Sequence, residues 1–105
     1  MPKKATKILV TGSEKLLARV PEEYVFWCHD GRALRDMPEL GEALTTMSDE
    51  TFAYHSNAEK QDFSNWVKDI IGDEKLAGDL AKASSRSEAA KKVAARIATI
   101  RKRSA

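Results

Sequence analysis

The stretch FAYHSNAEKQDFSNW, residues 52–66, decides how this chain folds, because one helical pattern ends in it and another begins. Asn57 is expected to stop the first helix, and Asp62 is expected to cap the second with its carboxylate. The aromatic residues on either side of these polar residues are expected to build the core. The stretch is therefore predicted to be a helix–loop–helix junction whose polar side chains cap and lock the turn.

Two helices are predicted before this junction. Asp36 is the expected N-cap of the first helix, and Glu39 three residues later completes a capping box. An apolar stripe with helical spacing follows, and it consists of Leu40, Ala43, Leu44 and Met47. Ser48 is the expected N-cap of the second helix, whose first turn is acidic, as the helix dipole prefers.

Three more helices are predicted after the junction. The first ends at Gly72, and the second is capped by Asp73. The third begins with Ser85 and Glu88 as a capping box. The buried face of the first is expected to consist of Phe63, Trp66, Val67, Ile70 and Ile71. The inward residues of the second are expected to be Leu76, Ala77, Leu80 and Ala81. The stripe of the third is expected to consist of Ala89, Ala90, Val93, Ala94, Ile97 and Ile100.

A β-hairpin is predicted ahead of the helices. Residues 24–28 are rich in aromatic and β-branched side chains, which favours a strand, and Gly31 supplies the turn to a partner strand over residues 32–34. Alternation along the first strand separates two faces, with Tyr24, Phe26 and Cys28 on one and Val25 and Trp27 on the other. Both faces are expected to be at least partly buried.

These elements predict a mainly α fold with a small N-terminal β-hairpin, which belongs to the α+β class. We expect one compact domain over residues 7–105, a bundle of about five short helices. Residues 1–6 are expected to be a disordered basic tail, followed by a short strand over residues 7–13 and a helical turn over residues 14–20. A basic C-terminal helix is expected over residues 85–103.

Charge is distributed unevenly along the 105 residues, although the net charge is only +2. Residues 22–80 carry five Lys or Arg and fourteen acidic residues, whereas residues 81–105 carry eight Lys or Arg and one acidic residue. Residues 1–21 are also basic. The basic ends are expected either to neutralise the acidic body or to meet an anionic partner.

The sequence favours a cytoplasmic location. Cys28 is the one cysteine of the chain and cannot form an internal disulfide, so we expect a buried, unreactive thiol in a reducing compartment. The apolar run near the N-terminus covers only residues 8–10, which is too short for the core of a signal peptide or for a membrane span. We therefore expect neither secretion nor membrane insertion.

Residues 22–80 resemble a small uncharacterised domain family found in many archaeal and some bacterial proteins. The motifs that carry the resemblance are a hairpin that ends in Gly31, then F-x-Y-H-x-N-x-x-K-x-D-F-x-x-W at residues 52–66 and I-G-D-x-x-L-A at residues 71–77. The family usually has Asn where this chain has Gln61. Because the family has no established activity, the resemblance implies a recurring binding or adaptor module and nothing catalytic.

The sequence contains no catalytic constellation or cofactor motif, so we expect a protein that is not an enzyme and takes no cofactor. His55, Glu59 and Asp62 would share one face of a continuous helix, which leaves a metal-dependent hydrolase as an alternative. The caps expected in the junction would separate these three, and His55 would then be a core-edge histidine bonded to the backbone. Cys28 and His29 are neighbours on a strand, so they point to opposite faces and do not form a nucleophile–base pair.

A second alternative is a nucleic-acid-binding protein that uses the basic C-terminal helix together with the basic N-terminal tail. The candidate phosphate contacts are Lys91, Lys92, Arg96, Arg101, Lys102 and Arg103. The same cations also have a structural explanation, because the helix dipole favours positive charge near a helix C-terminus. The apolar face of this helix is rich in alanine and lacks the bulky anchors of a membrane-binding helix, so no membrane partner is expected.

The function that the sequence favours is that of a protein-interaction or adaptor domain with an unidentified protein partner. The candidate interaction residues are Trp27, His55, Asn57, Asp62 and Trp66. One of the two tryptophans is expected to be partly exposed at the interaction surface. The sequence leaves the oligomeric state open.

Overall fold

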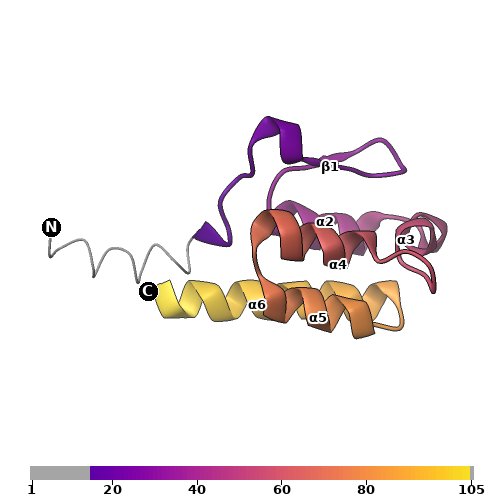
Figure 1. Ribbon diagram of the computed structural model, residues 1–105. Helices are drawn as coiled ribbons and strands as arrows, with labels where there is room; N and C mark the ends of the chain where they lie inside the picture. Colours follow the sequence, from indigo (N-terminus) through magenta and orange to yellow (C-terminus); the bar gives the residue numbers. More distant parts are fainter. Residues whose placement is uncertain (1–14, 105) are drawn as a thin grey trace, which may run out of the picture.

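Five α-helices and one β-hairpin follow one another along residues 15–104, the residues that this computed structural model describes (Figure 1). The elements are η1 (Glu22–Tyr24), β1 (Phe26–Trp27), β2 (Ala33–Leu34), α2 (Met37–Thr46), α3 (Asp49–His55), α4 (Asp62–Trp66), η2 (Val67–Ile71), α5 (Glu74–Lys82) and α6 (Arg86–Ser104). The predicted class, mostly helical with an N-terminal hairpin, is confirmed. α6 is not short, however, because it has 19 residues.

The region before the hairpin is described from residue 15 onward. The basic tail predicted over residues 1–6 and the strand predicted over residues 7–13 lie outside the described residues. Within the helical turn predicted over residues 14–20, Ala18 N–H donates to Lys15 O at 3.1 Å. Three half-buried side chains of this segment pack against the core, namely Leu16, Leu17 and Val20.

The hairpin lies above α2 and α4, and α5 and α6 run along the opposite side of the molecule (Figure 1). α6 packs along α2 and against α5, and α5 packs against α4. The approach of α2 to α6 is close at Gly41, where an added β-carbon would lie 3.1 Å from Val93 Cγ1. The absence of a side chain at this position therefore permits the close approach of the two helices.

Four helix N-caps lie where the sequence predicts them, at Asp36, Ser48, Asp73 and Ser85. Each side-chain oxygen accepts a hydrogen bond from the backbone N–H three residues later, at 2.8 to 3.1 Å. The return bonds of the two capping boxes are displaced by one residue. Glu39 accepts from Arg35 N–H at 2.8 Å, and Glu88 accepts from Ser84 N–H at 2.9 Å. Each glutamate thereby ties the preceding chain to the first turn of its helix.

The hairpin is shorter than predicted, because β1 covers only two of residues 24–28. It pairs antiparallel with β2, with Phe26 opposite Leu34, and Gly31 takes a positive φ of 98° in the turn, as predicted. The prediction that both faces are at least partly buried is wrong at Trp27, which is largely exposed. Phe26 occupies the place against the helices, so the next residue of the strand points to solvent.

The sequence predicted one continuous helix after the junction. The structure instead changes from α to π geometry after Trp66. Gly72 N–H donates to Val67 O at 2.8 Å, a bond that spans five residues. The wider turn shifts the following residues out of the α-helical register, and Ile70 and Ile71 are only half-buried against the core. Gly72 ends the turn with a φ of 90°, so the predicted stop is confirmed.

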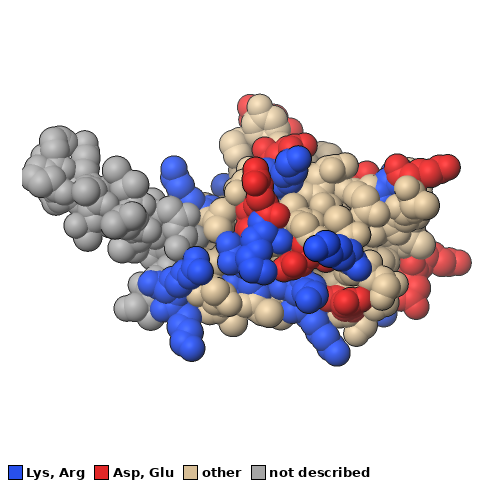
Figure 2. Space-filling model, turned by 60° about the horizontal axis from the view of Figure 1, so that its bottom comes forward, with Lys and Arg blue, Asp and Glu red and all other residues tan. Residues whose placement is uncertain are grey.

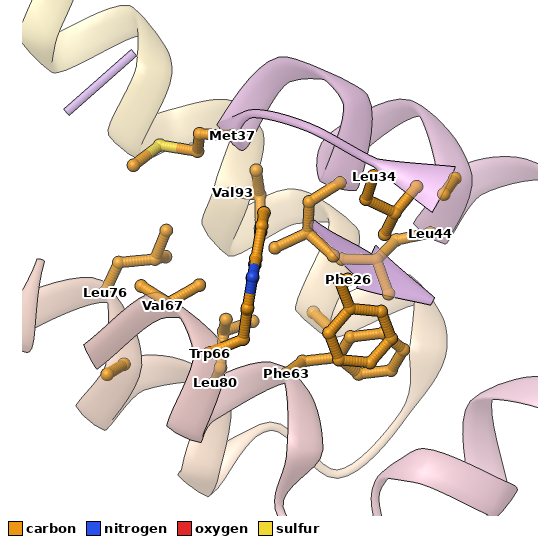
Figure 3. Packing of buried hydrophobic residues seen from close by; sticks show 14 of the residues in the cluster. Phe26, Leu34, Met37, Leu44, Phe63, Trp66, Val67, Leu76, Leu80 and Val93 are labelled. Carbon is orange, nitrogen blue, oxygen red and sulfur yellow. The ribbon is translucent and has the colours of Figure 1, made fainter. Parts of the chain in front are cut away.

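The core fills the space between the hairpin and the helices (Figure 3). Its largest fully buried side chains are Met37, Leu40, Leu44, Val67, Leu76, Val93 and Ile100. Phe26 stacks on Phe63, with ring centroids 5.1 Å apart, and thereby joins β1 to α4. Ala81 and Ala94 were expected inside but are exposed, because they lie at the edges of the buried faces of α5 and α6.

The close approach at Gly41 predicts opposite effects for two glycine substitutions in helices. Gly41→Val should lower the free energy of unfolding by about 1–3 kcal/mol, because the new side chain overpacks against Val93. Gly78→Ala in α5 should raise it by about 0.5–1 kcal/mol, because nothing lies within 4 Å of the added carbon and alanine favours helix. Urea unfolding of both variants measures the difference, and equal effects would contradict the predicted contact.

Candidate functional site

His55, at the end of α3, is the centre of the contacts that join the hairpin to the junction. Its side chain is buried, with 4% of the residue exposed. The ring nitrogen Nε2 accepts a hydrogen bond from His29 N–H at 2.9 Å, and Nδ1 lies 2.9 Å from Asp62 Oδ2. The histidine thus connects the hairpin turn, α3 and α4, and the prediction that it bonds to the backbone is confirmed.

These two contacts define the protonation of the imidazole. A backbone N–H only donates, so Nε2 of His55 must act as an acceptor and carries no proton. The proton of the neutral ring therefore lies on Nδ1, where it is donated to the Asp62 carboxylate. Because both nitrogens are engaged, the ring has no free nitrogen with which to take a proton from a substrate.

The prediction that Asp62 caps the second helix of the junction is wrong. The N-cap of α4 is Gln61, which makes no capping bond with its side chain, and Asp62 is the first helical residue. The Asp62 carboxylate faces His55 instead and lies 3.5 Å from Lys60 Nζ. A bond to a buried imidazole has replaced the local bond to the helix end, and the negative charge still lies in the first turn, where the dipole favours it.

Asn57 locks the loop between α3 and α4. Its side-chain NH₂ donates to Ala53 O at 2.8 Å, and its Oδ1 accepts from the backbone N–H groups of Glu59 and Lys60 at 2.9 and 3.0 Å. α3 ends just before it, so the predicted stop is confirmed. Asn57 is therefore part of the turn itself, and its amide is occupied by bonds within the loop.

A stack of polar and aromatic rings covers His55 on the outside. The His29 and Tyr54 rings are nearly parallel, with centroids 3.9 Å apart, and Lys60 Nζ lies 3.8 Å from the Tyr54 centroid. Tyr54 is 48% exposed. Tyr54 and His29 were not among the interaction residues predicted from the sequence, although the exposure of Tyr54 on α3 could have been found from helical spacing alone.

The two tryptophans have opposite environments. Trp66 lies in the core, edge-to-face with Phe26, and its Nε1–H donates to Tyr24 O at 2.8 Å. Trp27 is 68% exposed, and Tyr24 near it in the chain is 50% exposed. Trp66, proposed from the sequence as an interaction residue, therefore belongs to the core, while Trp27 is the exposed one. We call the exposed residues Tyr24, Trp27, His29 and Tyr54 the aromatic hairpin surface.

Cys28 is buried in the hairpin beside this surface, as expected. Burial raises the pKa of the Cys28 thiol, which lowers the fraction of nucleophilic thiolate at neutral pH. The neighbouring imidazole of His29 is stacked on Tyr54 and does not face the thiol as a base. Cys28 is therefore placed as a packed core side chain.

His55, Glu59 and Asp62 do not form a metal site. The loop separates Glu59 from the other two, so that only the imidazole and the Asp62 carboxylate meet. Among residues 15–104, no group of three or more His, Cys, Asp and Glu side chains is arranged to hold a metal ion. The metal alternative raised by the helical spacing lacks its ligand set in this part of the chain.

Arg96 differs from the other cations proposed to contact nucleic acid. Arg96 Nε lies 2.7 Å from Asp73 Oδ2, and the Asp73 side chain is almost completely buried while its other oxygen caps α5. The proposed role of Arg96 in phosphate contact is therefore corrected to an ion pair between α6 and the start of α5. Arg86, which the sequence did not single out, likewise ties α6 to Asp49 and to Leu44 O, both at 2.9 Å.

The remaining cations of α6 are exposed. They are Lys91, Lys92, Arg101, Lys102 and Arg103. No carboxylate of residues 15–103 lies within ion-pair distance of any of them. Figure 2, which turns the α5–α6 side forward, shows blue side chains over much of this face, with some red ones between them and more at the right-hand end.

Comparisons with family models, with curated proteins and with solved structures find no match for this chain. The resemblance of residues 22–80 to a prokaryotic domain family therefore stays a prediction. In residues 15–104, no helix has the length and apolar character needed to cross a membrane.

The His55–Asp62 contact predicts a difference between two substitutions of Asp62. Asp62→Ala should lower the free energy of unfolding by about 1–3 kcal/mol, because the buried Nδ1–H then has no acceptor. Asp62→Asn keeps an oxygen at this place and should retain most of the stability. Urea unfolding measures both. If the Asn variant loses as much as the Ala variant, the carboxylate charge and not the hydrogen bond stabilises the junction.

The buried ion pair predicts a second contrast, between two cations of α6. Arg96→Met should destabilise the fold by about 3 kcal/mol, because it leaves the Asp73 carboxylate buried without its partner. Lys92→Met is the matched control on the exposed face and should change stability by less than about 0.5 kcal/mol. Thermal and urea unfolding of the two variants test this, and equal stabilities would show that the pair is not formed in solution.

Proposed function

We propose that this chain is a non-enzymatic protein-interaction domain that binds its partner through the aromatic hairpin surface. The observation that carries the proposal is the exposure of Trp27 on a hairpin whose other face is anchored in the core. Trp and Tyr are enriched among the residues that dominate binding energy at protein interfaces.

The hairpin presents Trp27 on a fixed support. Trp66 Nε1–H holds Tyr24 O on one side of β1, and His55 holds His29 N–H at the turn. The residue opposite Trp27 in the ladder is Ala33, which is too small to cover the indole. The backbone that carries Trp27 therefore needs little ordering on binding, which lowers the entropic cost of the contact.

The surroundings of the indole indicate the chemistry of the partner. Glu22 and Glu23 of η1 are exposed just before the strand, and residues 22–80 carry a large excess of acidic residues. The partner is therefore a protein that offers an apolar pocket for the indole with Lys or Arg at its rim. We expect it to be met in the cytoplasm, in keeping with the single buried thiol.

Affinity capture with the full chain tests the proposal. Proteins retained by the wild-type chain are compared with those retained by Trp27→Ala and by Thr45→Ala, a control on the exposed side of α2. A true partner should bind Thr45→Ala normally and Trp27→Ala at least about tenfold more weakly, since an interface tryptophan contributes about 2 kcal/mol or more. Unfolding curves should be nearly unchanged for both variants, because both side chains are exposed.

The result that would contradict the proposal is a partner that binds Trp27→Ala as tightly as wild type. Raising the salt concentration gives a second readout. Binding should weaken moderately, because the predicted rim contacts are ionic, but should not vanish, because the indole contact is apolar.

A further inference from the structure

The outer face of α6 carries cations at both ends and small residues between them. Lys91 and Lys92 lie in its first half, and Lys102 and Arg103 lie in its last turn, eleven residues further on in each case. Eleven residues make slightly more than three full turns, so the two pairs lie on the same side of the helix, about 16 Å apart along the axis. The exposed residues between the pairs are Ala94, Ala95, Ala98, Thr99 and Arg101.

Helix stability explains only part of this charge. The helix dipole favours Lys102 and Arg103 in the last turn, but it gives no such reason for Lys91 and Lys92 in the first half. Among residues 15–103, no carboxylate forms an ion pair with these four cations. The charges of Lys91 and Lys92 act on Glu88, which is the one acidic residue of α6, so positive charge remains in excess on this helix and is available to an external anion.

A hollow between α5 and α6 extends this face on one side. Its lining includes Lys75, Lys92, Arg96 and Arg103, with Asp79 as the one acidic residue and Thr99 as a hydroxyl. A hydrogen bond from Lys75, with further effect from the charges of Lys92 and Lys82, lowers the pKa of Asp79, so this carboxylate stays ionised and occupied by Lys75. Arg96 is paired with Asp73, so the positive charge left for another anion in the hollow is that of Lys92 and Arg103.

We propose that α6 binds double-stranded DNA by lying across the major groove, with Lys91 and Lys92 on the phosphates of one strand and Lys102 and Arg103 on those of the other. The major groove is about 12 Å wide and admits an α-helix, which suits two cation pairs about 16 Å apart. Ala95 and Ala98 face the groove between the strands, and their small side chains permit close approach.

The same features favour duplex DNA over other polyanions. α6 carries no aromatic residue on which single-stranded bases would stack. The major groove of duplex RNA is too narrow for side chains to enter, so a helix fits it less well. The outer face of α6 also lacks the bulky apolar residues that insert into a membrane surface. Since the contacts are to phosphates, binding is nearly independent of DNA sequence.

Fluorescence anisotropy with the full chain and a short labelled duplex DNA, over a series of salt concentrations, tests the proposal. The logarithm of the association constant should fall with the logarithm of the salt concentration with a slope of about −3 to −4, as expected for four phosphate contacts. Lys102→Gln should weaken binding severalfold and reduce the slope by about 1. Lys68→Gln, in η2 outside this face, removes the same charge and should leave binding almost unchanged.

A second pair of variants tests the close approach without changing charge. Ala98→Gln adds bulk to the proposed contact face and should weaken binding severalfold with the salt slope unchanged. Ala81→Gln, at an exposed position of α5, is the matched control and should have no effect. Both substitutions keep a good helix former at an exposed position, so neither should unfold the protein.

Several outcomes would overturn the proposal: no binding at low salt, an equal loss for Lys68→Gln, or tighter binding to duplex RNA or single-stranded DNA. Binding to phosphatidylserine vesicles without binding to duplex DNA would assign the face to a membrane surface instead. The result is independent of the proposed protein partner, because Trp27→Ala leaves α6 unchanged. Loss of DNA binding in that variant would also contradict the assignment to α6.

Discussion

The buried imidazole of His55 is the contact on which the position of the hairpin depends. A two-stranded hairpin is marginal by itself, and this one is held because His29 N–H donates to Nε2 while Asp62 accepts from Nδ1. Trp66 Nε1–H adds a second tie, to Tyr24 O. With the turn and the base of the strand fixed, Phe26 must point to the core, and the alternation of the strand then leaves the next residue in solvent.

Two carboxylates, Asp73 and Asp62, each connect two elements. Asp73 caps α5 with one oxygen and pairs with Arg96 of α6 through the other, while Asp62 opens α4 and accepts from the imidazole at the end of α3. Replacing either carboxylate is expected to lower the free energy of unfolding, because the connection between two elements is lost with it. The ion pair also removes Arg96 from the surface, so the outer charge of α6 is carried by the remaining cations.

The two proposed surfaces differ in chemistry because the chain separates its charges along its length. The hairpin and junction lie in the acidic part of the sequence and expose aromatic rings, whereas α6 exposes cations and small residues. The packing of α6 along α2 at Gly41 buries the apolar stripe of α6 and turns its charged side outward. A domain of this size can therefore present an apolar anchor and a phosphate-contacting face without conflict between them.

The sequence by itself determined the class of fold and the order of the elements. It also determined the N-caps at Asp36, Ser48, Asp73 and Ser85, because each cap bond joins residues only three positions apart. It also located the junction and the stop at Gly72. Only the tertiary structure decided that Asp62 bonds to His55 instead of capping, that Arg96 is paired, and that Trp27 and not Trp66 is exposed. These outcomes depend on residues seven to forty-two positions apart, whose meeting is set by how the helices pack and not by any local pattern.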